Sequence, residues 1–125
     1  MTMQSRPLSP RLSIYRWMPG MLASISHRIS GVLLILFVPF YLWLLHSMTG
    51  SPQEFEQSMM LLHSPLGRLS LWLVSVAFVY HFCNGIRFLC LDVGWGESRE
   101  SMRLSARIVL AVAVISGIGF GVILW

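Results

Sequence analysis

A single histidine, His81, lies within an apolar stretch, residues 66–91, that is long enough to cross a lipid bilayer. Arg87 and then Asp92 follow it. Ionisable side chains at membrane depth are costly and are usually functional. Such an imidazole could be an axial ligand to a haem iron, and Gly85, one turn away, would let a flat macrocycle approach the backbone. The residues alone are equally consistent with a structural histidine that makes an interhelical hydrogen bond.

A second polar cluster precedes another apolar stretch, residues 29–48. In a helix, Ser24, His27, Arg28 and Gly31 recur on one face. A hydroxyl and a guanidinium can hydrogen-bond a quinone carbonyl, and a guanidinium also suits a carboxylate such as a haem propionate. The alternative, which the chemistry leaves open, is that Arg28 anchors the helix at the membrane surface and Ser24 caps it.

The composition points to a membrane protein. Of the 125 residues, 55% are hydrophobic and only 11% are charged, whereas soluble domains carry roughly 25% charged residues. This leaves no room for a separate soluble domain, so we expect one membrane domain over residues 1–125. The net charge of +4 comes from arginine alone. Because the arginines flank apolar stretches, we expect no nucleic-acid partner.

Several chemistries are excluded by the motifs that the sequence lacks. Cys83 and Cys90 would lie about 10 Å apart along one helix, too far for a disulfide. We find no glycine-rich nucleotide-binding motif, no cysteine cluster for iron–sulfur and no nucleophile paired with a base. The chain therefore cannot bind flavin by a Rossmann fold or reduce a dicarboxylate alone.

Three apolar stretches predict an all-α membrane protein with three transmembrane helices, at about 21–48, 66–93 and 103–125. Arginines gather before the first helix and between the second and third, so the positive-inside rule predicts a cytoplasmic N-terminus and a periplasmic C-terminus. We expect no cleaved signal peptide, and the short polar N-terminal segment favours a multi-pass protein of the bacterial inner (cytoplasmic) membrane. Buried polar groups on so few helices imply a second membrane subunit.

Other residues have simpler interpretations. We expect His46 and His63, near the first loop, to be interfacial or solvated. Trp43, Trp72 and Trp95 are typical of the aromatic belts at membrane surfaces. The G-x-x-x-G pattern at residues 117–121 predicts a face for close helix packing.

Three segments resemble the cytochrome b membrane-anchor subunit of succinate dehydrogenase, respiratory complex II. Residues 6–10, R-P-L-S-P, resemble that family's opening R-P-x-S-P, and an aromatic residue, Tyr15, follows. Residues 24–31, S-I-S-H-R-I-S-G, resemble its S-I-x-H-R-x-[ST]-G. Residues 81–92 resemble its H-x-x-[NV]-G-[IV]-R-H-[LM]-x-x-D. The resemblance covers essentially the whole chain, in the same order and with three helices.

The resemblance implies roles for individual residues. His81 matches the axial ligand of haem b, which is shared with a histidine of a second, smaller anchor subunit. Ser24 and Arg28 match residues that line the ubiquinone site near the iron–sulfur subunit. Arg28 and His27 match groups near the haem propionates. Electrons from succinate oxidation on FAD in a flavoprotein subunit would pass through iron–sulfur clusters to ubiquinone, and we expect no activity from this chain alone.

Two departures from the family pattern stand out. Phe88 takes the place of the usual histidine after G-I-R, which removes one polar group near the haem or quinone, and Arg11 replaces a histidine in the opening motif. Three alternatives remain on sequence grounds. The chain could be a fumarate reductase anchor, a non-catalytic membrane scaffold with a structural His81, or a small homo-oligomeric transporter with His81 and Arg87 on a substrate path.

Overall fold

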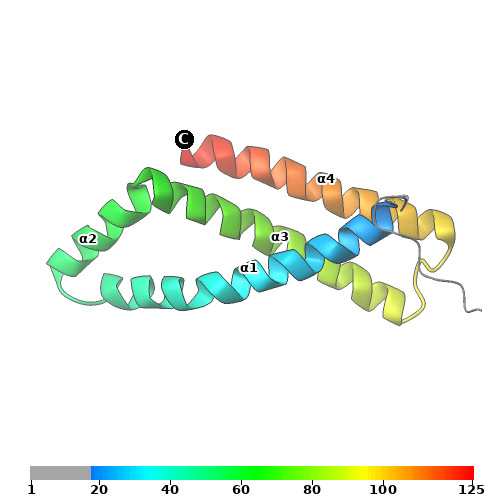
Figure 1. Cartoon of the computed structure of the whole chain (residues 1–125), viewed down its shortest axis with the longest axis horizontal. Coiled ribbons are helices and arrows are strands. Elements are labelled where there is room, and N and C mark those ends of the chain that lie inside the picture. The colour runs from blue at the N-terminus through cyan, green and yellow to red at the C-terminus, as the bar shows by residue number, and fades with distance from the viewer. Residues whose placement is uncertain (1–17) are drawn as a thin grey trace, which may run out of the picture.

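The computed structural model of the protein describes residues 18–125, and the expected features at Arg6, Arg11, Arg16 and segment 6–15 lie outside the described residues. The described part is all-helical. Its elements in chain order are α1 (Pro19–Met48), α2 (Pro52–His63), α3 (Pro65–Asp92) and α4 (Arg99–Leu124). Figure 1 shows α1 crossing α3, and α4 running beside α3 with its first turns near the start of α1.

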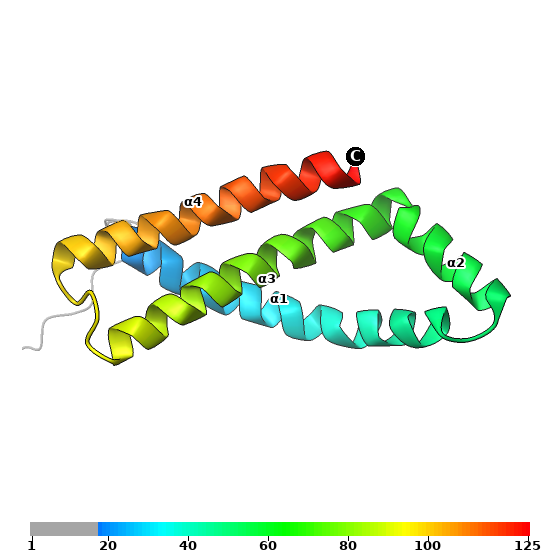
Figure 2. The same ribbon diagram turned by 180° about the vertical axis from the view of Figure 1, so that it is seen from behind.

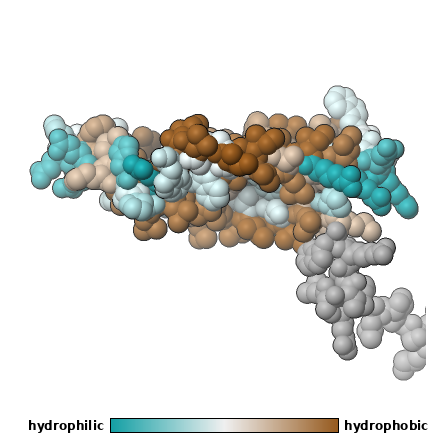
Figure 3. Space-filling view, turned by 90° about the horizontal axis from the view of Figure 1, so that it is seen from above, coloured by the Kyte–Doolittle hydropathy of each residue, from teal (hydrophilic) through white to brown (hydrophobic). Residues whose placement is uncertain are grey.

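Three of these helices, α1, α3 and α4, are long and apolar enough to span a membrane. The expectation of an all-α protein with three candidate spans is therefore confirmed. Most of their apolar side chains face outward. Val122 and Ile123, for example, are 78% and 77% exposed. The space-filling view shows brown hydrophobic surface along the middle of the bundle and teal surface at both ends (Figure 3). This is the surface of a chain that lipid or a partner subunit covers.

The first loop holds a helix that we did not expect. Ser51 caps α2 in a capping box: its hydroxyl accepts from the backbone N–H of Glu54, and the Glu54 carboxylate accepts from the backbone N–H of Ser51 at 2.7 Å. Pro52 supplies the first residue of the helix, where a missing N–H costs nothing. Figure 2 shows α2 linking the far ends of α1 and α3. His46 and His63 beside it are exposed, as we expected.

The turn between α3 and α4 depends on two glycines. Gly94 and Gly96 have φ angles of +84° and +79°, a region that other residues rarely adopt. Ser98 then caps α4 by accepting from the backbone N–H of Ser101. Because of this cap, α4 begins at Arg99, one turn before the start we expected at residue 103.

Close packing joins α3 to α4 at residue 117. The indole Nε1 of Trp72 donates to the carbonyl oxygen of Gly117 at 2.7 Å. A Cβ built on Gly117 or on Gly121 would lie 3.6 Å or 3.7 Å from the Trp72 ring, so the G-x-x-x-G face is a packing face, as we predicted. Trp72 therefore makes an interhelical contact, in addition to the aromatic-belt position that we predict for it, whereas Trp43 and Trp95 are exposed.

Candidate functional site

Two imidazoles, from different helices, stack where α1 crosses α3. The ring centroids of His27 and His81 lie 3.9 Å apart and the ring planes differ by 8°. Gly31 makes this approach possible, because a Cβ at that position would lie only 3.0 Å from Cε1 of His81. Both rings are half-buried. The two sequence clusters, separate in the chain, therefore meet at this crossing.

The neighbours of His81 decide which ring nitrogen carries its proton. Its Nδ1 lies 3.1 Å from the carbonyl oxygen of His27 and 3.1 Å from Oγ of Ser30. A carbonyl oxygen only accepts, and the Ser30 hydroxyl already donates to that same carbonyl at 2.8 Å. We therefore assign the proton to Nδ1, which donates to α1. Nε2 then keeps its lone pair, and no group within residues 18–125 forms a hydrogen bond with it.

This geometry bears on the choice between a structural and a haem-binding His81, which the sequence left open. The interhelical hydrogen bond of a structural histidine is present, but it uses only one nitrogen of His81. Metal-bound histidines typically donate their other N–H to a backbone carbonyl, which fixes the ring's orientation and tautomer. The hydrogen bond and a ligand role for Nε2 are therefore compatible.

Gly85 has a different neighbour from the one we expected. The flat group nearest to it is the His27 imidazole, whose Cε1 would lie 3.7 Å from a Cβ at Gly85. Phe88 contacts the same imidazole edge-on, with the ring centroids 5.2 Å apart. Within this chain, the space beside Gly85 is filled by a side chain, and Phe88 serves to pack His27.

Two more residues of α3 fasten it to α1. The Tyr80 hydroxyl and the Asn84 amide both donate to the carbonyl oxygen of Ala23, at 2.7 Å and 3.1 Å. Asn84 and Ala23 are fully buried. Oδ1 of Asn84 and Nδ1 of His27 are buried without a hydrogen-bond partner in the described part of the chain. We did not assign a role to Tyr80, Asn84 or Ser30 from the sequence, although all three lie within or beside the two clusters.

Ser24 and Arg28 lie apart from the stacked rings. Arg28 is exposed and borders a shallow apolar cavity of about 310 Å³, lined also by α1 residues of the next two turns. Ser24 is half-buried in the second turn of α1, so the alternative that it caps the helix is wrong. Neither side chain forms a hydrogen bond with another described residue. A binding site that includes Ser24 and Arg28 would need further contacts from groups outside residues 18–125.

Arg87 ties α3 to α4. Its Nε donates to Oγ of Ser105 at 3.0 Å and its Nη2 donates to the carbonyl oxygen of Met102 at 3.3 Å. Asp92, at the end of α3, is exposed.

Within the described residues there is no group of three or more histidine, cysteine or acidic side chains placed to hold a metal ion. Nε2 of His81 is thus a candidate for one axial position and not part of a complete protein-ligated metal site.

Comparisons with known proteins show the family to which the chain belongs. Residues 2–120 match the family described as "Succinate dehydrogenase/Fumarate reductase transmembrane subunit". The chain is 36% identical over 121 residues to the succinate dehydrogenase cytochrome b556 subunit of Coxiella burnetii, an alignment that covers 96% of this chain and 97% of the relative. It is 32% identical to the cytochrome b556 subunit of Paracoccus denitrificans, over 89% and 85% of the two chains. It is also 35% identical to the mitochondrial cytochrome b560 subunit of Sus scrofa, over 92% and 69%.

The three-span helical fold and these matches define a membrane subunit of a respiratory oxidoreductase, and the chain belongs to the succinate dehydrogenase/fumarate reductase transmembrane subunit family. The three relatives described above are named as cytochrome b subunits of succinate dehydrogenase. The resemblance we found from the sequence is therefore confirmed. The chain is a multi-pass membrane protein involved in electron transport, as we predicted, and its bacterial relatives support the bacterial inner membrane as its location.

Proposed function

We propose that this chain is the membrane-anchor subunit that binds haem b through His81 and forms part of a ubiquinone-reduction site with Ser24 and Arg28. The observation that carries the proposal is the distance of 3.1 Å between Nδ1 of His81 and the carbonyl oxygen of His27. Because a carbonyl oxygen only accepts, we assign the proton to Nδ1, which leaves the Nε2 lone pair for iron. The similar chains are named cytochrome b subunits, which supports a b-type haem as the ligand.

The residues around His81 fit such a group. When bound, a haem supplies a one-electron redox centre. Ser30 and the carbonyl of His27 hold the imidazole in one tautomer, and Gly31 lets it lie flat against α1. His27 contributes by stacking on the ligand ring, in addition to the propionate contact that the resemblance implies. A further ligand to the group would be supplied by the smaller anchor subunit, as the resemblance implies.

Arg28 and Ser24 are proposed to hold the quinone. The exposed guanidinium of Arg28 would donate to one quinone carbonyl and stabilise the negative charge that develops there during reduction. The Ser24 hydroxyl would donate to the same head group. The exposure of Arg28 supports a site whose remaining walls come from the iron–sulfur subunit and the second anchor subunit.

We infer the orientation and the partners from charge and family together. A cytoplasmic N-terminus would put Ser24 and Arg28 on the side where the iron–sulfur and flavoprotein subunits dock. There, two electrons from succinate oxidation and two protons reduce the quinone. The relatives' names favour succinate oxidation over the reverse reaction of a fumarate reductase, although the family description includes both.

The test uses the whole complex purified from its native membrane in mild detergent, in four forms: wild type, His81→Leu, Arg28→Leu and Arg107→Leu. Arg107 is an exposed arginine on α4 and serves as the charge-matched control. We expect His81→Leu to weaken or alter the reduced-minus-oxidised haem spectrum. Arg28→Leu should keep that spectrum and lose quinone reductase activity by about 100-fold. Arg107→Leu should resemble the wild type in both measurements.

Two results would overturn these assignments. An unchanged spectrum in His81→Leu would show that another residue is the ligand, and wild-type turnover in Arg28→Leu would remove Arg28 from the quinone site. If the native preparation holds neither haem nor flavoprotein, the chain is a scaffold with a structural histidine.

A further inference from the structure

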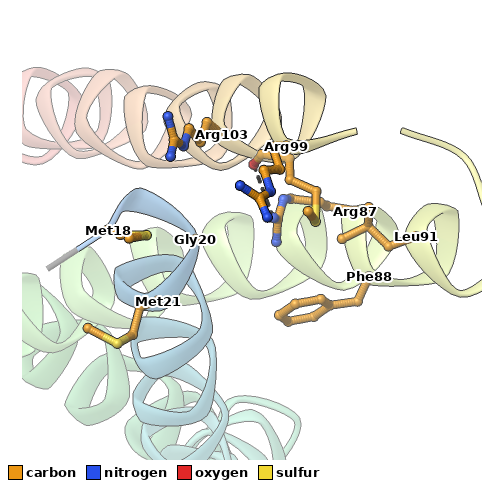
Figure 4. Close-up of a pocket in the computed structure, with 9 residues that line it drawn as sticks. Met18, Gly20, Met21, Arg87, Phe88, Leu91, Arg99 and Arg103 are labelled. Atoms are coloured by element: carbon orange, nitrogen blue, oxygen red, sulfur yellow. Dashed lines mark hydrogen bonds between the residues drawn. The ribbon is translucent and has the colours of Figure 1, made fainter. Parts of the chain in front are cut away.

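A basic cavity of about 750 Å³ lies at the end of the bundle where α1 begins, α3 ends and α4 begins (Figure 4). Three arginines line it, Arg87, Arg99 and Arg103, and no acidic side chain does. None of the three forms an ion pair with a carboxylate within residues 18–125. Positive charge is therefore concentrated in this cavity without a counter-charge from the part of the chain that the structure describes.

Arg87 is the buried member of the three, with 9% of its surface exposed. Two of its nitrogens are held by Ser105 and Met102 of α4, while its Nη1 has no hydrogen-bond partner among the described residues. A buried guanidinium retains its charge under all ordinary conditions, so a group left without a counter-ion is costly. An anion in the cavity would remove that cost.

The backbone adds to the positive potential. Both α1 and α4 begin at this cavity and α3 ends there, so two helix N-termini face one C-terminus. Ser98 caps α4, whereas Met18, the residue before α1, provides no side-chain cap. Helix N-termini present free N–H groups and a positive dipole, which favour a bound anion. The segment before Met18 carries three arginines and no acidic residue in its sequence, so it cannot supply the counter-charge.

The rest of the lining is apolar. Met18, Met21, Phe88, Leu91 and Met102 form it. The Arg87 guanidinium lies over the Phe88 ring, 5.5 Å from its centroid, and Figure 4 shows Met21 apart from the arginines. A cavity lined by both guanidinium groups and apolar side chains suits an amphiphile. The cavity lies at the ends of three candidate spans, and the loop that joins α3 to α4 at this end carries the exposed Trp95. We therefore expect the cavity to lie at the depth of the lipid head groups.

We propose that this cavity binds an anionic phospholipid, with the phosphate at Arg87, Arg99 and Arg103 and the first part of an acyl chain against the methionines and Phe88. None of the proposed haem and quinone residues lines this cavity, although its Phe88 also packs against His27. The function of the site is to hold the start of α1 against α3 and α4. Basic pockets between membrane helices are known to bind lipid phosphates. The apolar lining argues for a lipid over free phosphate.

The test measures lipid retention by the whole complex in lipid nanodiscs that contain equal amounts of phosphatidylglycerol and phosphatidylcholine. The variant is Arg103→Gln and the control is Arg107→Gln, which removes the same charge from the same helix one turn away, outside this cavity. After mild detergent extraction, native mass spectrometry counts the lipids that remain bound. We expect the wild type and Arg107→Gln to retain phosphatidylglycerol preferentially. In Arg103→Gln, the ratio of retained phosphatidylglycerol to phosphatidylcholine should fall about fivefold.

Three outcomes would overturn the proposal. Arg103→Gln could retain the wild-type lipid preference. Inorganic phosphate could bind the detergent-solubilised complex as tightly as phosphatidylglycerol does, which would leave the apolar lining without a role. Arg103→Gln could release the soluble subunits while lipid selection stays unchanged, which would make the cavity a contact for an acidic segment of a partner protein. Equal melting temperatures of the two variants show that a loss of lipid does not come from unfolding.

Discussion

At the scale of the residue, the contact between His81 and the backbone of α1 explains how one imidazole can pack against α1 and also be free to bind a metal ion. Nδ1 serves the helix crossing and Nε2 remains for a ligand. Gly31, and not Gly85, is the glycine that this contact requires, since only at Gly31 would a Cβ press on the His81 ring. The packing of α1 on α3 therefore sets the direction of the proposed ligand nitrogen.

This difference between the two glycines gives a prediction. Gly31→Ala should push the His81 ring by a few tenths of an ångström, because the new Cβ would lie 3.0 Å from Cε1. We expect an altered haem spectrum and a loss of stability of about 1–3 kcal/mol. Gly85→Ala is the control, since its Cβ would meet His27 at an ordinary 3.7 Å. The same spectrum and melting temperature in both variants would show that Gly31 does not position the ring.

The sequence was enough to predict which residues form the site, but it could not predict which side chains contact one another there. The types and helical spacing of His81, His27, Ser24 and Arg28 were enough to single them out, because helix periodicity shows which residues share a face. The stack of two imidazoles could not be predicted, since it depends on where α1 crosses α3 and on both side-chain rotamers. For the same reason, Gly85 seemed open to a macrocycle, while the structure fills that space with His27.

At the scale of the element, α2 owes its start to the capping box of Ser51 and Glu54. The backbone N–H of Ser51, and then its hydroxyl, hold the pKa of the Glu54 carboxyl below its ordinary value. A carboxyl with a lowered pKa in the folded state stabilises that state above its ordinary pKa. This contribution disappears as the pH falls through the lowered pKa.

We therefore expect the first turn of α2 to fray in acid. Hydrogen exchange, corrected for the intrinsic pH dependence of the amides, should show lost protection there as the pH falls below the ordinary carboxyl range. Glu54→Gln should lack this pH dependence, and Glu56→Gln, whose side chain takes no part in the capping box, should keep it. Equal pH dependence in both variants would show that the capping box is not the cause.

The junction of α3 and α4 gives a second prediction at this scale. Trp72→Phe keeps most of the ring that packs on Gly117 and Gly121 but removes the donor to the Gly117 carbonyl. We expect a destabilisation of about 0.5–1.5 kcal/mol, measured by denaturation of the complex. Trp43→Phe is the control, because Trp43 is exposed and donates no hydrogen bond to a described residue. A larger effect at Trp43 would place the important contact elsewhere.

The three spans were predictable because length and hydropathy alone identify a membrane helix. The short helix α2 was missed, although S-P-Q-E at residues 51–54 has the spacing of a capping box. Its low hydrophobicity made the segment resemble a loop. The start of α4 was also misplaced by one turn, since the charged residues from Arg99 to Arg103 continue the helix beyond the apolar stretch.

At the scale of the whole molecule, the chain presents far more apolar surface than three packed helices bury. Phe78 and Phe82 on α3 and Ile35 on α1 are all more than half exposed. In a bilayer, lipid can cover such side chains, but Arg28 and the Nε2 of His81 need polar or metal partners. The need of these two groups for partners supports assembly with further subunits.

The measurement that tests the central proposal most directly is an experimental structure of the complex, determined by electron cryomicroscopy with its haem in place. We expect iron bound to Nε2 of His81, with Nδ1 still directed at the carbonyl oxygen of His27 and the second axial ligand from the smaller anchor subunit. Iron bound through Nδ1, or bound by residues other than His81, would contradict the assignment on which the proposed function rests.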